Sequence, residues 1–285
     1  MSIAKDPVYA LSSSRKDEHE RLGRQSSMYE QFTRRLLARA GIEPGMRVLD
    51  VGCGAGDVSL LLSDLVGAEG SVVGVERDEK ALATAHRRAI ASGAANVEFV
   101  LGDFREVEFV DDSFDMLVGR LVLMYQGDPA EAVRAAARHV RSHGVVVFAE
   151  MCMRTGSVKP ERFLVSWPPT PASEELSVWI DAAFSGQGTQ PDMGMRLPET
   201  FAEAGLLPSP ELDSEVVIAV GEDAISETVE FARSLLPRIV AAGAATEAEV
   251  DMPTLADRLR AGSGSVGRIT FWPTMVGAFA TKPEP

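Results

Sequence analysis

The sequence is poor in the residues that build disulfide scaffolds and zinc sites. Only 2 cysteines and 4 histidines occur among its 285 residues. No two of them have the spacing of metal ligands on one predicted helix or strand, and small disulfide-rich domains need more cysteines than this chain has. We therefore expect neither a disulfide framework nor a metal ion.

Positive charge is scarce as well. Against 42 Asp and Glu the chain has 28 Lys and Arg, a formal net charge of −14, whereas affinity for nucleic acids and anionic membranes comes from basic side chains. No apolar run reaches the ~18–20 residues that cross a bilayer, and the N-terminus lacks the apolar core of a signal peptide. The sequence predicts a soluble, cytoplasmic protein that binds neither nucleic acid nor membrane.

Short apolar runs alternate with segments of helical periodicity in the first half of the chain. This alternation is typical of βαβ units and predicts an α/β fold, a parallel sheet with helices on both faces. The predicted strands are 47–51, 71–75, 97–101, 114–118 and 145–150, and the predicted helices are 57–66, 78–92 and 130–140.

The pattern changes after Glu150. We interpret 41–285 as one domain with insertions at about 155–196 and 222–264, and we expect single strands at 211–220 and 269–280. Residues 1–40 contain a helical segment with apolar side chains, although the sheet does not begin before residue 47. We predict that 1–40 form a lid over the carboxyl edge of the sheet; a helix packed on the flank of the sheet is the alternative.

A glycine-rich turn, VLDVGCGAGDV at Val48–Val58, lies between a predicted strand and a predicted helix. Its glycines, Gly52, Gly54 and Gly56, fall at relative positions 1, 3 and 5, whereas the dinucleotide fingerprint has them at 1, 3 and 6. Glycines allow the backbone to approach a ligand at this edge of the sheet. The alternative is a plain tight turn.

Carboxylates follow the next two predicted strands. Glu76, in GVERDEKAL, could accept two hydrogen bonds from the hydroxyls of a ribose. Asp103, in FVLGDF, could accept the amino group of an adenine while Phe104 flanks the ring. Each acid alone could be a helix cap or a solvated charge, but three such features at three successive strand ends together indicate a nucleotide site.

These motifs resemble those of the class I S-adenosylmethionine-dependent methyltransferases. VLDVGCGAGDVSLLL is similar to the first motif of that family, VVGVERDEKAL to the second and FVLGDF to the third, over roughly residues 41–150. The resemblance implies a Rossmann-like, seven-stranded mixed sheet with an antiparallel last strand, and S-adenosylmethionine as the cofactor. The core also resembles ubiquinone/menaquinone C-methyltransferases.

The resemblance further implies which residues contact the cofactor. The glycine turn would border its methionine part, Glu76 its ribose, and Asp103 with Phe104 its adenine, while Gln25 could reach it from the lid. The complete predicted set is Asp50, Gly52, Cys53, Gly54, Gly56, Glu76, Arg77, Asp103, Phe104, Arg120 and Gln25.

The catalytic candidates are Glu150, Arg120 and Tyr9. Glu150 ends the fifth predicted strand and would orient the methyl acceptor or take its proton. Arg120 could bind a carboxylate of cofactor or substrate, or could form a structural ion pair, and Tyr9 could hydrogen-bond from the lid. Aromatic residues at 155–196, with Trp272, favour an apolar acceptor pocket.

The expected function is methyl transfer to a small, rather apolar organic molecule. The chain lacks the Asn/Asp-Pro-Pro-Tyr/Phe quartet of enzymes that methylate nucleic-acid amino groups, and it has no acidic cluster for a divalent metal. None of the four histidines is expected at the catalytic edge unless His19 reaches it from the lid, and Glu150 is the better-placed ionisable group. This weak set of bases favours C- or N-methylation over O-methylation. Methylation of a protein and a non-catalytic S-adenosylmethionine-binding protein remain alternatives. The chain could also form a homodimer.

Overall fold

The computed structural model describes residues 29–110, 112–153, 164–185, 188–262 and 267–284. The chain divides into two compact units. The sheet unit comprises 22–150, 193–214 and 275–285, and the inserted unit includes 151–192 and 215–274. Tyr9 and Gln25, two of the predicted site residues, lie outside the described residues.

The sheet unit contains a seven-stranded sheet with the order β3-β2-β1-β4-β5-β10-β7. The first five strands of this order pair in parallel, and β10 is antiparallel, as the reciprocal bonds His143 N to Lys282 O and Lys282 N to Gly144 O indicate (both 2.9 Å). The strands are β1 (Arg47–Val51), β2 (Ser71–Glu76), β3 (Val97–Leu101), β4 (Phe114–Arg120), β5 (Val140–Cys152), β7 (Leu207–Glu215) and β10 (Thr274–Thr281).

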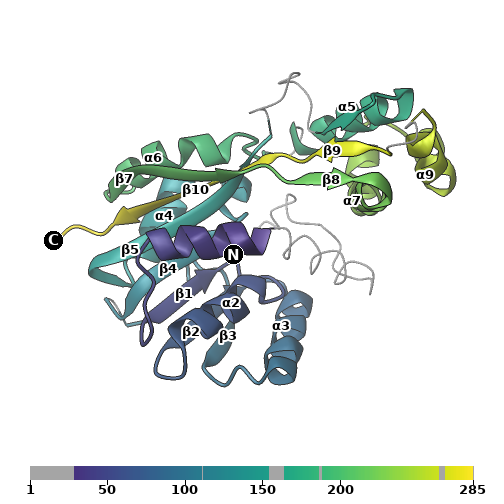
Figure 1. Ribbon diagram of the computed structural model, residues 1–285. Helices are drawn as coiled ribbons and strands as arrows, with labels where there is room; N and C mark the ends of the chain where they lie inside the picture. Colours follow the sequence, from purple (N-terminus) through teal and green to yellow (C-terminus); the bar gives the residue numbers. More distant parts are fainter. Residues whose placement is uncertain (1–28, 111, 154–163, 186–187, 263–266, 285) are drawn as a thin grey trace, which may run out of the picture. The chain divides into compact units, whose positions relative to one another are not determined.

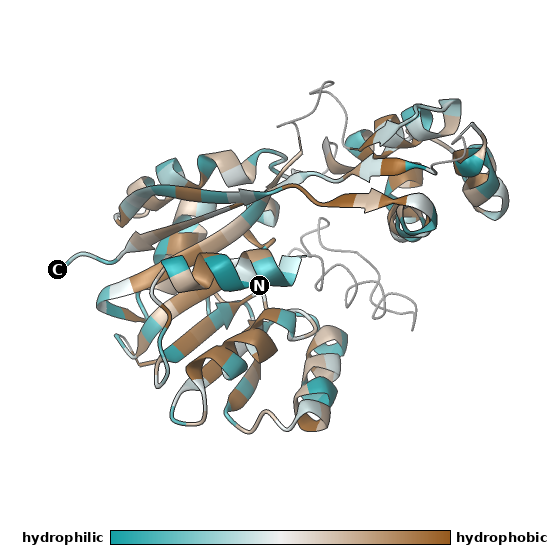
Figure 2. Ribbon diagram, viewed as in Figure 1, coloured by the Kyte–Doolittle hydropathy of each residue, from teal (hydrophilic) through white to brown (hydrophobic). Residues whose placement is uncertain are grey.

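Helices cover both faces of this sheet (Figure 1). Hydrophobic residues are concentrated on its central parallel strands (Figure 2), because parallel strands covered on both faces bury most of their side chains. The helices are α2 (Asp57–Val66), α3 (Glu79–Ser92), η2 (Leu123–Tyr125), α4 (Pro129–Ala137) and α6 (Met193–Glu203). The predicted seven-stranded mixed sheet is confirmed.

A further helix, over 29–39, packs on the seven-stranded sheet. Phe32 and Leu36 are buried and contact Gly277 of β10, where the side chain of any other residue would clash with them. On the polar side, Arg35 donates to Asp213 of β7 at 2.8 Å. This segment therefore packs against the sheet, while residues 1–28, the larger part of the predicted lid, lie outside the described residues.

The inserted unit has a three-stranded antiparallel sheet with the order β6-β9-β8. Helices α5, α7 and α9 contact one another, and α5 and α7 also contact the strands. The elements are β6 (Val165–Trp167), α5 (Pro171–Ser185), β8 (Ile218–Val220), α7 (Gly221–Ala241), α8 (Glu247–Val250), α9 (Met252–Arg260) and β9 (Ile269–Phe271).

The expectation of single strands at 211–220 and 269–280 is wrong. Each segment forms two strands that belong to different sheets, β7 with β8 and β9 with β10. The second segment breaks at Trp272 and Pro273, because proline has no N–H to donate to a ladder. Trp272 turns inward instead, and its ring meets that of Phe231 edge to face at 5.2 Å.

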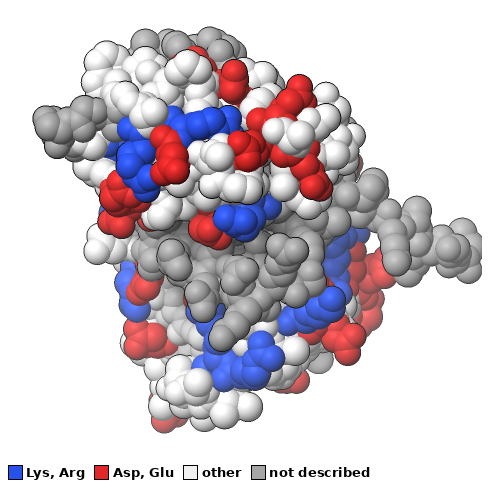
Figure 3. Space-filling model, turned by 90° about the vertical axis from the view of Figure 1, so that its right-hand side faces the viewer, with Lys and Arg blue, Asp and Glu red and all other residues white. Residues whose placement is uncertain are grey.

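Charged side chains of both signs are interspersed on the face of the molecule shown in Figure 3. Many of the described arginines pair with acids, such as Arg39 with Glu211 at 2.7 Å. Within the described residues, no helix is both long and apolar enough to span a bilayer.

Candidate functional site

The glycine turn follows β1 and has the backbone conformation that only glycine adopts without strain. Gly52, Gly54 and Gly56 have φ angles of +65°, +54° and +83°. A Cβ at Gly52 would lie 2.7 Å from Cγ2 of Val122, whereas a Cβ at Gly54 would meet no atom within 4 Å. The turn is thus closely packed at its start and open at Gly54.

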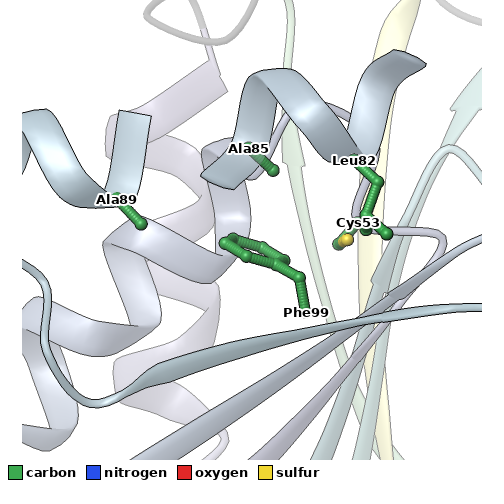
Figure 4. Close-up of a cluster of buried hydrophobic side chains, with 5 residues drawn as sticks. All are labelled: Cys53, Leu82, Ala85, Ala89 and Phe99. Atoms are coloured by element: carbon green, nitrogen blue, oxygen red, sulfur yellow. The ribbon is translucent and has the colours of Figure 1, made fainter. Parts of the chain in front are cut away.

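A buried apolar cluster fixes this turn to α3. Its members are Cys53, Leu82, Ala85, Ala89 and Phe99 (Figure 4). Gly56 lies against two of them, since a Cβ there would come within 3.0 Å of Cβ of Ala85 and 3.2 Å of the Phe99 ring. Burial raises the pKa of the Cys53 thiol, which is part of this packing. The side chain of Cys53, a predicted cofactor contact, therefore packs in this cluster.

Glu76 ends β2 and holds the glycine turn from the neighbouring strand. Its Oε2 accepts the N–H of Gly54 at 3.0 Å, and its Oε1 accepts those of Arg77 and Asp78 at 2.8 and 2.9 Å. Burial raises the pKa of Glu76, and these three hydrogen bonds oppose the shift. A carboxylate has about four acceptor positions, so one remains on Oε2. The side chain of Arg77 is exposed.

Asp50 lies on β1, two residues before Gly52 of the turn. It accepts a 2.5 Å hydrogen bond from Ser59 Oγ of α2, and burial raises its pKa to about 7. Arg120 ends the adjacent β4 and donates to Thr33 Oγ1 at 3.2 Å. Burial lowers the pKa of Arg120, whereas the carboxylates of Asp57 and Asp50 raise it. Arg120 thus lies near acidic side chains at the same strand ends.

Asp103 follows β3 and pairs with a neighbour in the chain. Its Oδ1 accepts the N–H and Nε–H of Arg105 at 3.0 and 2.9 Å, and its Oδ2 contacts Nη2 at 2.5 Å. Burial raises the pKa of Asp103, but these contacts outweigh burial and leave the pKa below its ordinary value. Phe104 is buried beside it. An adenine amino group would therefore share this carboxylate with Arg105.

Glu150, near the end of β5, has no exposed surface and holds a second turn. Its Oε1 accepts the N–H groups of Val122 and Leu123 at 2.8 and 2.7 Å, and its Oε2 accepts that of Met124 at 3.3 Å. Burial raises its pKa to about 7, and the three N–H groups oppose the shift. The same turn contains Leu121 at φ +59°, a conformation that non-glycine residues rarely adopt.

Parallel pairing brings these strand ends to one edge of the sheet. Val51 of β1 is opposite Val75 of β2 and Gly119 of β4. The structure therefore joins the glycine turn, Glu76, Asp103 and Arg120 along one edge, as the sequence predicted for parallel strands.

Sequence reasoning missed three residues of this edge. Ser59 is a polar residue on the buried stripe of α2 that includes Leu62 and Val66, and that helical spacing is a signal that could have revealed it. No comparable signal marks Val122 or Leu121, whose roles depend on the turn after β4.

No group of three or more His, Cys, Asp or Glu among the described residues could hold a metal ion. The histidines that the structure describes have other contacts. The ring of His86 packs on Phe99 with centroids 5.1 Å apart, His143 contacts Glu284 at 3.1 Å, and His139 is buried beside Phe109.

Known proteins share this sequence pattern and fold. A protein from Staphylococcus aureus (strain MRSA252), named demethylmenaquinone methyltransferase, is 29% identical over 153 residues, which are 53% of this chain and 63% of that protein. The chain thus spans less than two thirds of that relative's length.

Two solved structures share the fold. The YcgJ protein of Bacillus subtilis has a TM-score of 0.55 at 18% identity, covering 94% of this chain and 100% of its own. The protein BH2331 of Bacillus halodurans C-125 has a TM-score of 0.58 at 17% identity, covering 88% of this chain and 98% of its own.

The methyltransferase domain family matches residues 42–184, half of the chain. That range begins before β1 and includes the glycine turn, Glu76, Asp103 and Glu150. The chain therefore belongs to the methyltransferase domain family, as its resemblance to the class I S-adenosylmethionine-dependent methyltransferases predicted.

Proposed function

We propose that the protein transfers a methyl group from S-adenosylmethionine to carbon or nitrogen of a small, rather apolar organic molecule. The family match and the edge built by four strand ends support the transfer. The relative from Staphylococcus aureus carries the name of a demethylmenaquinone methyltransferase, which favours a small molecule as acceptor over a protein.

The strand ends fit the cofactor. The open position at Gly54 leaves room for a ligand against the backbone, and the remaining acceptor position on Glu76 Oε2 suits a ribose hydroxyl. Arg120 would face the carboxylate of the methionine part, and Asp103 with Phe104 the adenine. When bound, the cofactor supplies a methyl group on a sulfonium, a good leaving group.

The protein's own part in such a reaction is positioning. Holding two reactants in line lowers a barrier by ~7–11 kcal/mol without acid–base chemistry. Both oxygens of Glu150 are bound to the backbone of the turn after β4, so we assign it to positioning that turn. None of the histidines that the structure describes could act as a base at this edge, which supports C- or N-methylation over O-methylation.

The observation that carries the proposal is the pair of Gly54 and Glu76, an open backbone position held by a strand-end carboxylate. Glu76→Gln should weaken binding of S-adenosylhomocysteine about 10–100-fold, because it removes charge-assisted hydrogen bonds worth ~1.5–3 kcal/mol. The exposed Glu79→Gln, on the first turn of α3, is the matched control and should bind as the unchanged protein does.

Transfer itself is measured with methyl-labelled S-adenosylmethionine and a mixed panel of small molecules, with products identified by mass spectrometry. Label in small apolar products supports the proposal. Label only in added proteins would indicate the protein-methylating alternative, and cofactor binding without any transfer would indicate a non-catalytic binding protein.

A further inference from the structure

The helix over 29–39 lies outside residues 42–184, the part of the chain that matches the methyltransferase domain family. It is nevertheless firmly attached to the sheet unit. Leu36 is buried against β10, and Nη1 of Arg34 donates to Asp64 of α2 at 3.1 Å. Contacts with both a strand and a helix fix the position and the rotation of the helix over 29–39. Its buried hydroxyl group is thereby held in a defined place.

That hydroxyl group belongs to Thr33, which is 2% exposed. It donates to the carbonyl oxygen of Tyr29, one helical turn earlier, at 2.7 Å. A hydroxyl has one proton and two acceptor positions, so with its proton engaged the oxygen of Thr33 acts as an acceptor. It accepts Nη1–H of Arg120, at the end of β4, at 3.2 Å. The backbone of the helix thus directs the lone pairs of Thr33 at the guanidinium.

A neutral acceptor suits an arginine that binds an anion. Burial lowers the pKa of Arg120 and the carboxylates of Asp57 and Asp50 raise it, so two acids lie within electrostatic reach of the guanidinium. Ser59 binds Asp50, and Arg88 binds Asp57, both at 2.5 Å. A hydroxyl, by contrast, orients a guanidinium without neutralising its charge. Because the N–H groups of a guanidinium form a rigid plane, an acceptor at Nη1 also restricts the directions of the others.

We propose that Thr33 is a positioning residue for methyl transfer, which orients Arg120 toward the carboxylate in the methionine part of S-adenosylmethionine. This inference rests on the proposed function, which assigns that carboxylate to Arg120. It gives the helix over 29–39 a part in cofactor recognition, through one hydroxyl group and without a contact between Thr33 and the cofactor.

The test compares two ligands that differ only in the carboxylate, S-adenosylhomocysteine and decarboxylated S-adenosylhomocysteine. Thr33→Val keeps the shape of the side chain and removes the hydroxyl. In calorimetry it should weaken binding of S-adenosylhomocysteine about ten-fold, because a misdirected guanidinium makes poorer charge-assisted hydrogen bonds. Binding of the decarboxylated ligand should not change. Thr33→Ser, which keeps the hydroxyl, should bind both ligands as the unchanged protein does.

Thr228→Val is the matched control. Thr228 of α7 is also 2% exposed, and its hydroxyl donates to the carbonyl oxygen of Ala224, one helical turn earlier, at 2.6 Å. It therefore makes the same local hydrogen bond as Thr33, but it belongs to the inserted unit. Both valine variants should lower the urea midpoint of unfolding by similar amounts. Only Thr33→Val should change the affinity for S-adenosylhomocysteine.

A double variant tests whether Thr33 acts through Arg120. Arg120→Ala should weaken S-adenosylhomocysteine binding more than Thr33→Val does, and adding Thr33→Val to it should cause no further loss, because residues that share one interaction are not additive. If Thr33→Val does not fold, Thr33→Ala replaces it in every comparison, since it removes the hydroxyl without placing a methyl group beside the guanidinium.

Three results would overturn the proposal. Equal affinity of the unchanged protein and Thr33→Val for S-adenosylhomocysteine would show that the hydroxyl does not orient Arg120. An equal loss for both ligands would show a structural role only. A further ten-fold loss in the double variant would show that Thr33 acts independently of Arg120. Failure of the proposed function is distinguishable, because the unchanged protein would then not bind S-adenosylhomocysteine at all, which would contradict both proposals.

Discussion

The turn after β1 and the turn after β4 lie at the same edge of the sheet, and a buried carboxylate from a neighbouring strand holds each of them. Glu76 accepts the N–H of Gly54 in the first turn. Glu150 accepts the N–H groups of Val122, Leu123 and Met124 in the second.

The two turns obtain their backbone conformations in different ways. The first uses glycines at positive φ, which cost little there, and it stays open at Gly54. The second places Leu121 at φ +59°, a conformation that costs energy and that surrounding contacts must enforce. The backbone conformation of the first turn depends on its glycines, whereas that of the second depends on the contacts around Leu121. Substitutions in the two turns should therefore have different effects.

The largest effect is expected from Glu150→Gln. The amide group can replace only one acceptor oxygen, and its NH2 would face a backbone N–H of the second turn. We expect the free energy of unfolding to fall by about 3 kcal/mol, because a buried donor without an acceptor costs about 1–3 kcal/mol. Urea denaturation measures this, with the exposed Glu98→Gln on β3 as the control. Unchanged stability and full turnover of the Glu150→Gln protein would show that Glu150 does not hold the second turn.

A substitution in the first turn should weaken ligand binding more than it lowers the stability of the protein. Gly54→Ala and Gly93→Ala both place a Cβ at positive φ with no atom within 4 Å, so each should lose about 1 kcal/mol of stability. Only Gly54→Ala should weaken S-adenosylhomocysteine binding, by about 100-fold, because its Cβ occupies ligand space. Calorimetry decides the matter, and equal affinities in the two variants would contradict a ligand at this turn.

The buried carboxyl of Asp50, just before the first turn, should make the stability of the protein depend on pH. Burial raises its pKa from an ordinary value of 3.8 to about 7 in the folded protein, so the folded state binds more protons between these values. The stability that Asp50 contributes is therefore complete below about pH 4 and is lost as the pH rises through 7. Between pH 5 and pH 7, the unchanged protein should lose about 2 kcal/mol relative to Asp50→Asn. Parallel curves for the two proteins would show that burial does not perturb this carboxyl.

Chelation should have no effect. The carboxylates of both turns are engaged by backbone N–H groups, so we expect neither to serve as a metal ligand. Methyl transfer should proceed at the same rate in excess EDTA. Activity that EDTA abolishes and Mg²⁺ restores would show that a metal acts at this edge.

Much of the sheet unit could be predicted because its signals are local. The strands at 47–51 and 97–101 and the helix at 57–66 have the predicted limits, since apolar periodicity and glycine stops operate over a few residues. The inserted unit was harder. Its strands have 3 residues each, too few for a period to be recognised, and nothing local separates β9 from β10 except Trp272 and Pro273.

By itself, the sequence determined the glycine turn, the acid at the end of β2 and the family, because these depend on residue type and on spacing within short segments. Only the tertiary structure decided what Glu150 binds, since its partner Val122 lies 28 residues away in the chain. It also decided that three short strands from distant segments share one sheet. Contacts of this kind arise when packing brings remote segments together, and no local pattern encodes them.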